Sequence, residues 1–353
     1  MPLPLAVRNF GSLPDGNPVE AWTLFGRGGL VLETITYGAT VTRLLAPDQN
    51  GRLADVVLGF NDLDSYLAGH AYFGAMIGRV AGRVTGAQFS LDGRTYKLTQ
   101  NEAPNHLHGG RHGFDKRAWT ATVKNAGRAP SVRLSYRSPD GEEGYPGEVD
   151  VAVTYTITDD NVFLVEVEAS TDQPTPFCLT QHSYFNLAGE AEGTILDHEL
   201  QIDSDEFILT SENRTLLGEV GSVDRWNNDF REPRILRDAV PFLFQNHGDL
   251  YRVRRGTRDG RTLRPATIAR LVHPASGRVL EVSTTETHLQ LYTGVALDGA
   301  LIGKSGVPYR QYSGVCLECE NYPDGVNSPT LGDIILRPGA TRREMTAYAF
   351  GTL

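Results

Sequence analysis

The sequence predicts an all-β protein, and three observations support this prediction. Apolar and polar residues alternate along most segments in which a pattern can be read, as they do in strands that are buried on one face. Signals for helices are weak. The chain contains 38 Gly and 19 Pro residues, more than an average protein of this length, which indicates many turns. So many strands require two large stacked sheets or a closed barrel.

The first readable elements are short. Asp62 can cap a helical turn or two over residues 62–67. Residues 89–98 are typical of a β-hairpin, because apolar residues alternate on both sides of the turn Asp92-Gly93. A further strand is predicted over residues 132–136.

The clearest hairpin of the chain spans residues 149–169. Apolar residues occupy every second position over residues 149–157 and again over residues 163–169. Between these two segments lie Asp159, Asp160 and Asn161, which are typical turn residues. The pattern therefore predicts two paired, half-buried strands.

Later segments are also predicted as strands. Residues 177–187 are expected to form one strand, and residues 279–282 are expected to pair with residues 289–292. Residues 315–320 alternate as well. No linker, charge block or fixed repeat marks a boundary, although a prior of ~150 residues per domain suggests two domains. We therefore expect residues 1–353 to form a single domain.

Composition excludes several classes of function. The chain has 33 Lys and Arg residues against 43 Asp and Glu residues, a net charge of -10 that disfavours binding to nucleic acid or to an anionic membrane. The N-terminus lacks the features of a secretory signal, and no apolar run approaches the ~20 residues of a membrane span. We expect a cytoplasmic protein.

The cysteines fit a reducing compartment. Cys178, Cys316 and Cys319 are too few and too clustered to stabilise a chain of this size with disulfides. The CxxC spacing of the last two is also found in redox and zinc sites, but no second pair accompanies it. Buried packing is the favoured interpretation.

A first polar cluster surrounds His106 and His108. In an extended segment these two histidines point to the same face, and Gly109-Gly110 allow backbone or ligand to approach closely. A metal site that uses His112 as a third ligand is an alternative, but the carboxylate expected shortly after such a pair is absent. Histidines bonded within a polar loop are a second alternative.

Two further clusters lie on predicted strands. Thr180, His182, Tyr184 and Asn186 share one face of their strand, which is either a functional face or a solvated one. In the strand of residues 315–320, Glu318 and Glu320 share one face. Their mutual repulsion raises the pKa of at least one carboxyl group and favours a general base, unless the strand is an exposed edge.

Taken together, the clusters resemble a known family. The stretches GRVAGRVTGAQFSLDGRTYKL, NEAPNHLHGGRHGFDKRAW, GYPGEVDVAVTYTIT, LTQHSYFNLAG and CLECENYPDGVN are similar to those of the aldose 1-epimerases, or galactose mutarotases, in the same order over nearly the whole chain. This resemblance implies a β-supersandwich fold with a sugar-binding cleft. It also implies interconversion of the α and β anomers of free aldoses such as galactose or glucose, without cofactor or metal.

The resemblance also implies roles for individual residues. Glu318 is the expected base, His182 the expected acid, and His108 is expected to assist at the ring oxygen and orient the sugar. A carboxylate and an imidazolium on opposite sides of the ring can open a hemiacetal, so His182 must be charged in the resting site. The residues expected to bind the sugar hydroxyl groups are Arg83, Asp249, Gln290 and Tyr184.

The chain departs from the family pattern at several positions. Gly82 replaces a usual Asn, Val295 replaces another, and Glu320 stands where Gln is common. Asp249 comes from the segment His247-Gly-Asp249, whereas the family usually has an Asp-His pair followed by an aromatic residue. These departures affect one hydroxyl contact, the local charge at Glu318 and the assignment of Asp249.

Two other functions remain open at the level of the sequence. A sugar-phosphate epimerase needs a basic pocket, and an arginine run is present at positions 252, 254, 255, 258, 261 and 264, although Asp259-Gly260 within it is typical of a hairpin tip. A sugar-binding protein without catalysis is the second alternative. The preferred aldose and the choice between monomer and homodimer do not follow from the sequence.

Overall fold

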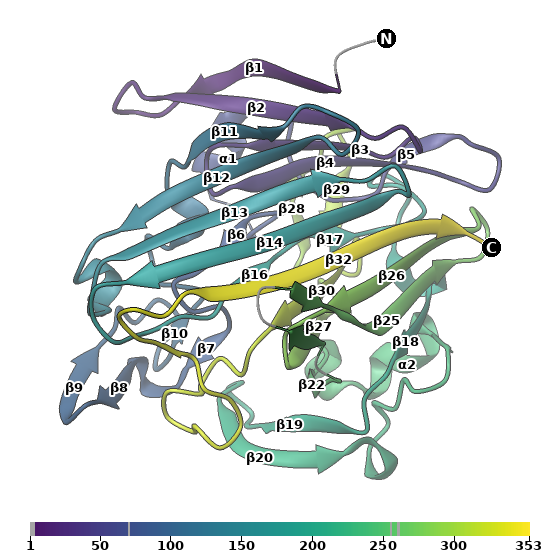
Figure 1. Cartoon of the computed structure of the whole chain (residues 1–353). Coiled ribbons are helices and arrows are strands. Elements are labelled where there is room, and N and C mark those ends of the chain that lie inside the picture. Colours follow the sequence, from purple (N-terminus) through teal and green to yellow (C-terminus); the bar gives the residue numbers. More distant parts are fainter. Residues whose placement is uncertain (1–3, 70, 255, 260–261) are drawn as a thin grey trace.

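The structure is a computed structural model that describes residues 4–69, 71–254, 256–259 and 262–353. In this part of the chain the largest sheet has nine antiparallel strands, and it forms the broad layer at the front of Figure 1. Its strands, in spatial order, are β11 (Thr120–Asn125), β12 (Ser131–Ser138), β13 (Val149–Ile157), β14 (Val162–Thr171), β32 (Arg342–Thr352), β26 (Arg278–Thr284), β25 (Ala266–His273), β18 (Glu199–Ile202) and β21 (Arg234–Ile235).

Two further sheets pack around this layer. An N-terminal sheet lies at the top of Figure 1, and a sheet that carries much of the site lies behind the large one. The first consists of β1 (Leu5–Ser12), β2 (Pro18–Phe25), β3 (Val31–Ile35), β4 (Thr40–Pro47) and β5 (Leu53–Asp55). The second consists of β17 (Tyr184–Phe185), β30 (Val315–Glu320), β27 (His288–Tyr292), β22 (Leu250–Arg252), β19 (Glu206–Thr210) and β20 (Leu216–Ser222).

The remaining strands form short pairs. These pairs are β6 (Met76–Ile77) with β16 (Thr180–Gln181), β7 (Arg83–Val84) with β10 (His106–Leu107), β8 (Gln88–Leu91) with β9 (Arg94–Lys97), β15 (Thr175–Pro176) with β31 (Ile335–Leu336), β23 (Thr257–Asp259) with β24 (Thr262–Arg264), and β28 (Asp298–Ile302) with β29 (Pro308–Arg310). The α-helices are α1 (Leu63–Leu67) and α2 (Leu236–Ala239). No described helix is long and apolar enough to cross a membrane.

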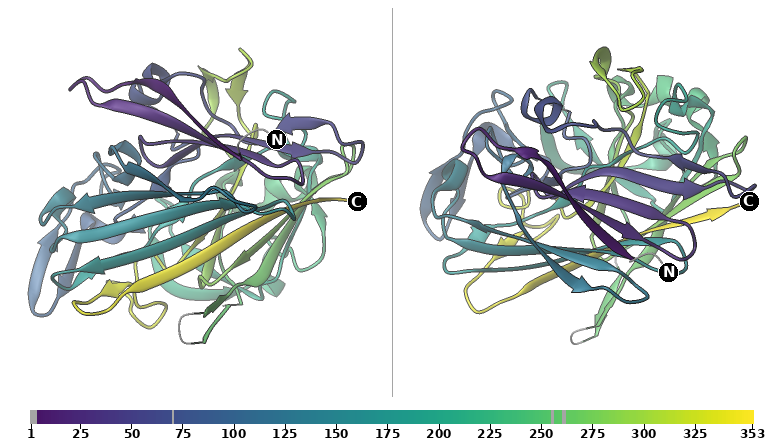
Figure 2. Two further views of the ribbon diagram at one scale, coloured as in Figure 1. Left: turned by 45° about the horizontal axis from the view of Figure 1, so that its top comes forward. Right: turned by 90° about the horizontal axis from the view of Figure 1, so that it is seen from above.

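The sheets enclose one large core. The inward residues of β13 and β14 belong to the same apolar cluster as Leu289 and Leu291 of β27 and Val315, Leu317 and Cys319 of β30. Because successive side chains of a strand point to opposite faces, the other face of β30 is turned away from this core. The two views of Figure 2 show the layers and the twist of the large sheet.

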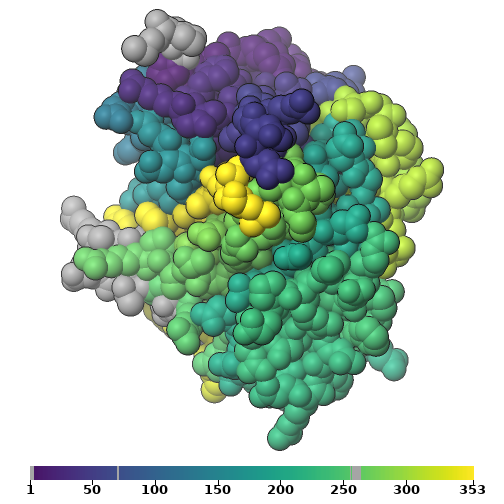
Figure 3. Space-filling view, turned by 90° about the vertical axis from the view of Figure 1, so that its right-hand side faces the viewer, coloured from purple at the N-terminus to yellow at the C-terminus, as the bar shows by residue number. Residues whose placement is uncertain are grey.

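The two ends of the chain contribute to the same body. The end of β32 lies at the surface beside N-terminal segments, as Figure 3 shows for the yellow C-terminus and the neighbouring blue residues. Nearby, the amide of Gln49 in the β4–β5 turn donates to the carbonyl of Ser276 at 3.1 Å. The N-terminal sheet is thereby tied to the β25–β26 hairpin.

Several predicted elements are confirmed. Strands β13 and β14 pair over their full predicted length, and β8 pairs with β9 across Asp92-Gly93. The strand of residues 132–136 lies within β12. Asp62 caps α1 by accepting a hydrogen bond from the Ser65 amide at 2.8 Å. Gly260, part of the predicted hairpin tip, lies outside the described residues.

Two strand predictions are wrong. Residues 177–187 do not form one strand, because the backbone pairs with β6 at β16 and then with β30 at β17. Residues 279–282 pair with β25 and β32, while residues 289–292 pair with β22 and β30. Alternation identifies the buried face of a strand but carries no information about its partner.

Candidate active site

A cavity of about 220 Å³ opens beside β30. It is smaller than the roughly 300–1,000 Å³ of sites for drug-sized ligands, and this size suits a small molecule. The sequence-predicted site residues that line it are Arg83, His108, His182, Tyr184, Gln290 and Glu318. Chain segments more than 200 residues apart in the sequence therefore meet in one site.

Strand β30 positions Glu318. This strand lies between β17 and β27, and all six of its residues are buried, so the alternative of an exposed edge strand is wrong. Glu318 is opposite Gln290 in the register of β27, and Tyr184 of β17 is opposite Cys316. Neighbouring strands thus bring Glu318, Gln290 and Tyr184 to one wall of the cavity.

His182 is held between β16 and β17 by backbone contacts. Its amide donates to the carbonyl of Ala75 at 2.9 Å, and its carbonyl accepts from the amide of Gly74 at 2.9 Å. The side chain of the preceding Gln181 donates to the Gly74 carbonyl at 2.9 Å and accepts from the Ser183 amide at 3.1 Å. These bonds fix the turn in which the His182 ring points into the cavity.

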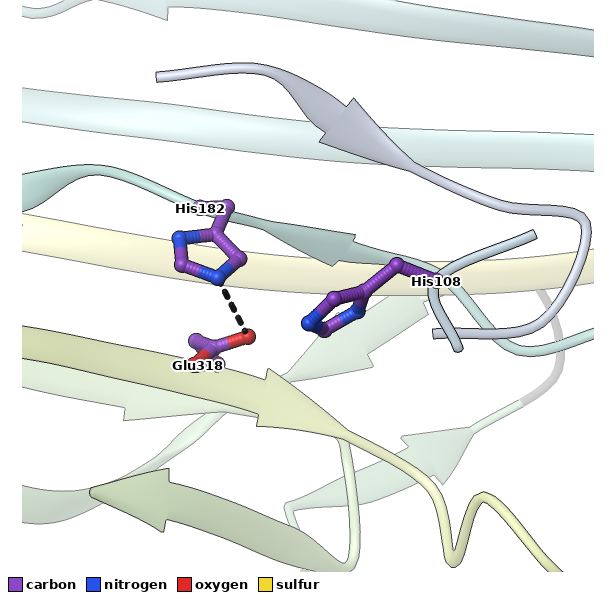
Figure 4. Close-up of side chains that lie close together, drawn as sticks. All are labelled: His108, His182 and Glu318. Atoms are coloured by element: carbon purple, nitrogen blue, oxygen red, sulfur yellow. Dashed lines mark ion pairs between the residues drawn. The ribbon is translucent and has the colours of Figure 1, made fainter. Parts of the chain in front are cut away.

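His182 and Glu318 form the centre of the site. Nε2 of His182 points at Oε2 of Glu318 (Figure 4). The two atoms lie 3.4 Å apart, and both side chains are only 3% exposed. Burial raises the pKa of Glu318, and the positive charge of Arg83 opposes this shift. The sequence interpretation placed these two groups on opposite sides of a ring, whereas the structure places them side by side.

His108 faces this pair from another element. It follows β10 in the left-handed region, with φ 51°, and its ring centre lies 5.3 Å from that of His182. The amide of Gly82 donates to Nδ1 of His108 at 3.1 Å. Burial, followed by the neighbouring His182, lowers the pKa of His108 well below its usual value. The neutral ring therefore carries its proton on Nε2, as assigned from this hydrogen bond.

His106 has a structural role. Its Nδ1 contacts the carbonyl of Thr99 at 2.7 Å and its Nε2 contacts the hydroxyl of Tyr145 at 2.9 Å, so both ring nitrogens are occupied. The extended segment ends at Leu107, and His106 and His108 consequently do not share a face.

Arg83, Tyr184 and Gln290 are the other predicted residues that line the cavity. The Arg83 guanidinium binds Glu102 through two hydrogen bonds of 2.6 and 2.7 Å. The Tyr184 ring stacks on His182 with centroids 5.1 Å apart. Gln290 donates to the carbonyl of Leu291 at 2.5 Å.

The structure places Asp249 elsewhere. Asp249 precedes β22 and lines a separate cavity with Trp226 and Phe242, while the next residue, Leu250, lines the cavity of Glu318. Neighbouring residues of an extended segment point in opposite directions, which explains this separation. Asn228 donates to Asp249 at 3.0 Å, and burial raises the pKa of Asp249 to about 6. Asp249 was expected to line the same cavity as the other predicted residues, and this expectation is corrected because its side chain lines the separate cavity.

Other cavity residues were not identified from the sequence. Tyr72 lies beside two of the catalytic candidates, with its ring centre 4.7 Å from that of His108 and 5.7 Å from that of His182. His247 and Tyr292 form a further ring contact of 4.5 Å, and Arg214 also lines the cavity. These residues lie in turns or at strand ends, where alternation gives no signal, although His247 belongs to the segment that raised the question about Asp249.

The polar cluster also has the composition of a metal site. Ligand atoms of His108, His182 and Glu318 lie within 4.8 Å of one another. This set differs from the His106, His108 and His112 alternative derived from the sequence. Two imidazoles and a carboxylate are groups that hold a zinc ion in some proteins and transfer protons in others.

The cysteines lie in the core, as predicted. All three are buried and free. Cys316 and Cys319 point to opposite faces of β30, and Sγ of Cys316 lies 3.6 Å from Nδ1 of His182. Their CxxC spacing thus does not form a chelating pair.

The arginine run does not reach the cavity within the described residues. Arg252 pairs with Glu206 and Arg254 with Asp203, and none of the lining residues comes from the run. Arg255 and Arg261 lie outside the described residues, and so does the side chain of Arg258. The basic pocket expected for a sugar phosphate is therefore not formed by these described arginines.

Comparison with known proteins places this arrangement in a family. The family model for aldose 1-epimerase matches residues 20–349. The chain belongs to the aldose 1-epimerase family. It is 43% identical to human galactose mutarotase over 341 residues, which cover 97% of each chain, and 33% identical to the Escherichia coli K12 aldose 1-epimerase over 354 residues, which cover 96% of each.

Solved structures confirm the fold expected for an aldose 1-epimerase. A Caenorhabditis elegans aldose epimerase homologue superimposes with a TM-score of 0.84 at 29% identity and covers 94% of this chain and 98% of its own. A galactose 1-epimerase from Lactobacillus acidophilus gives 0.84 at 24% identity with 99% of both chains covered, a likeness that concerns the fold alone. The predicted β-supersandwich of large antiparallel sheets is thus confirmed.

Proposed function

We propose that this member of the aldose 1-epimerase family is a mutarotase that interconverts the α and β anomers of free aldoses such as galactose and glucose. The observation that supports this most is the buried contact of His182 with Glu318 in a cavity that His108 also faces. Relatives named galactose mutarotase, at 40 to 44% identity over nearly the full length, support the same activity.

Ring opening requires two proton transfers at neighbouring atoms. The Glu318 carboxylate takes the proton of the C1 hydroxyl group, the C1–O5 bond breaks, and the ring oxygen takes its electron pair and a proton from the His182 imidazolium. The C1 and ring oxygens are bonded to the same carbon. An acid and a base that lie 3.4 Å apart can therefore serve both atoms without moving.

Ring closure uses the same two groups in reverse. Rotation about the C1–C2 bond turns the other face of the aldehyde toward the C5 hydroxyl group. That hydroxyl oxygen attacks C1 and returns its proton to His182, while the new C1 oxygen takes the proton from Glu318. Each well-placed acid or base contributes about 10²- to 10⁴-fold to the rate.

The other cavity residues position the sugar. Neutral His108 offers the proton on its Nε2 to the ring oxygen, and Arg83, held by Glu102, offers its remaining donors to a hydroxyl group. Gln290 and Tyr184 present an amide and a phenol from the wall of the cavity. No step requires a metal or a cofactor, and we include their absence in the proposal.

The surroundings of the site fit a neutral substrate. Glu102 neutralises Arg83, and the net charge of -10 neither attracts nor repels an uncharged sugar. We also propose that the protein acts in the cytoplasm, where three free buried cysteines are stable, as one domain over residues 1–353, and as a monomer or homodimer.

Polarimetry tests the proposed function. Freshly dissolved α-galactose or α-glucose is expected to reach its equilibrium rotation faster with the protein than without it, at a rate unchanged by a metal chelator and by added glucose 6-phosphate. Equal rates with and without protein contradict the proposed activity. Loss of activity in chelator contradicts the metal-free chemistry, and strong inhibition by the phosphate indicates a sugar-phosphate enzyme.

A further inference from the structure

A second carboxyl group of the cavity has no role in the proton transfers described above. Glu320 lies two residues after Glu318 on the same face of β30, is 1% exposed and lines the same cavity. Its Oε2 has no hydrogen-bond partner among the described residues. An unpaired buried oxygen is costly, so a partner supplied by the substrate is a physical reason for its placement.

The charges near Glu320 are mostly negative. Glu318 lies on its own strand, and Glu286 approaches from the segment between β26 and β27. The cation that faces it, Arg83 of β7, is bound by Glu102 through both an Nε and a terminal nitrogen. Carboxyl groups thus outnumber cations here.

The other titratable groups beside Glu320 are neutral. His288 is opposite it on β27, and burial lowers the pKa of this histidine to about 3. Burial raises the pKa of the Cys178 thiol well above its usual value. Burial, then Glu318 and Glu286, likewise raise the pKa of Glu320 well above that of an ordinary glutamate.

Gly82 opens the space in front of Glu320. Its φ is +68°, and a Cβ atom there would lie 2.4 Å from Cγ of Pro323 and 3.5 Å from Oε1 of Glu320. A side chain at this position would fill the volume next to the carboxyl group. Because Gly82 also donates its amide to His108, the opening lies beside the catalytic groups.

We propose that Glu320 binds the substrate as a neutral carboxylic acid, donating its O–H to one hydroxyl group of the aldose and accepting from the same or a neighbouring hydroxyl with its other oxygen. In this form it contributes to the choice of sugar and leaves Glu318 as the carboxylate of the site. The inference rests on the proposed mutarotase activity. A protonated carboxyl group combines an O–H donor with a carbonyl acceptor, and the amide of glutamine likewise combines N–H donors with a carbonyl acceptor.

Two variants test the contact with substrate. Glu320→Gln keeps a donor and an acceptor at this position, and we expect its KM for galactose at neutral pH to rise less than that of Glu320→Ala. Glu320→Ala removes both, and we expect KM to rise roughly three- to tenfold, the factor for one hydrogen bond of ordinary strength.

Sugars that lack single hydroxyl groups identify the contact. The derivatives of galactose each lack the hydroxyl group at C2, C3, C4 or C6. For one of them we expect the wild-type KM to be raised already, and we expect Glu320→Ala to cause no further rise in KM for that derivative. Equal discrimination by the wild type and Glu320→Ala overturns the inference. In that event the wild type still mutarotates galactose, whereas failure of the proposed function leaves the wild type inactive.

Infrared spectroscopy tests the protonation state without relying on activity. At neutral pH the wild-type spectrum minus that of Glu320→Gln should contain the carbonyl stretch of a protonated carboxyl group, shifted by galactose. A carboxylate band in its place overturns the inference. Glu286→Gln is the matched control, since it removes a nearby buried carboxyl group that does not line this cavity. The KM values of Glu286→Gln should match those of the wild type. If its KM rises as much as that of Glu320→Ala, the rise in KM comes from a structural disturbance and not from a lost contact with the sugar.

Discussion

At the scale of single residues, hydrogen-bond partners separate histidines that the sequence makes equivalent. Both ring nitrogens of His106 are used by Thr99 and Tyr145, whereas His108 uses Nδ1 for the Gly82 amide and lines the cavity beside His182. The spacing in the sequence could not make this distinction, because the backbone turns at His108. The resemblance to a family selected the candidate residues of the site, and the structure brings all of them except Asp249 to one cavity.

Replacement of the proposed acid should stop the reaction while the protein stays folded. In His182→Asn the imidazolium that protonates the ring oxygen is lost and the neutral His108 remains only as a hydrogen-bond donor, so we expect kcat to fall by roughly 10²- to 10⁴-fold. KM should change much less. Steady-state polarimetry measures both constants, and a melting curve monitored by circular dichroism checks the fold. A kcat within a factor of ten of the wild type would show that another group supplies the proton.

A buried histidine far from this chemistry should make the protein sensitive to acid. His198 accepts a hydrogen bond from the Leu187 amide at 2.9 Å, and burial, with a smaller effect of His273, lowers its pKa from 6.5 to about 3. Below pH 6.5 the unfolded chain therefore binds a proton that the folded chain does not, and stability falls as the pH falls toward 3.

His198→Gln removes this contribution. Between pH 7.5 and 4.5 the free energy of unfolding of the wild type should fall by on the order of 2 kcal/mol more than that of the variant. Urea titrations at the two pH values measure the difference. Parallel losses in both proteins would show that His198 is protonated in the folded state.

At the scale of elements, long regular strands were predictable and short irregular ones were not. The β13–β14 hairpin combines nine or more alternating residues with a turn, and each signal agrees with the other. The segment of β16 and β17 alternates in the same way, but it changes its partner strand within a few residues. Strand partners depend on contacts distant in the sequence, which a local pattern does not contain.

The turn between β16 and β17 is expected to control the rate through the position of His182. Gln181→Ala removes the side-chain bonds to Gly74 and Ser183. We expect kcat to fall by roughly tenfold, the effect of misplacing the acid slightly, with KM and the pH dependence of kcat/KM nearly unchanged. Gln201→Ala on β18, which removes a side-chain hydrogen bond to the carbonyl of Arg231, is the control. Equal kcat values for the two variants would contradict this role.

At the scale of the whole molecule, the fold class followed from the sequence and the arrangement of the sheets did not. Alternation and turn residues predicted strands throughout, and the structure contains large antiparallel sheets around one main core. The order of the nine-stranded sheet joins β14 to β32, which are 170 residues apart in the chain. The cavity exists only because such distant segments meet at β30.

The position of Asp249 illustrates the same limit. Its placement in the sugar site came from the similarity of a short segment, yet a shift of one residue along an extended chain reverses the direction of a side chain. The structure places Leu250 in the cavity of Glu318 and Asp249 in another cavity with Trp226. A sequence comparison over a few residues does not resolve such a shift.

The central claim is that Glu318 is the base and that its neighbour Glu320 is not. Polarimetry of α-galactose at neutral pH with Glu318→Gln and Glu320→Gln tests this claim most directly, because the two variants make the same chemical change two residues apart on one strand. We predict a loss of roughly 10²- to 10⁴-fold in kcat for Glu318→Gln and a change of less than about twofold for Glu320→Gln. A Glu318→Gln enzyme with wild-type kcat, or equal losses in both variants, contradicts the account.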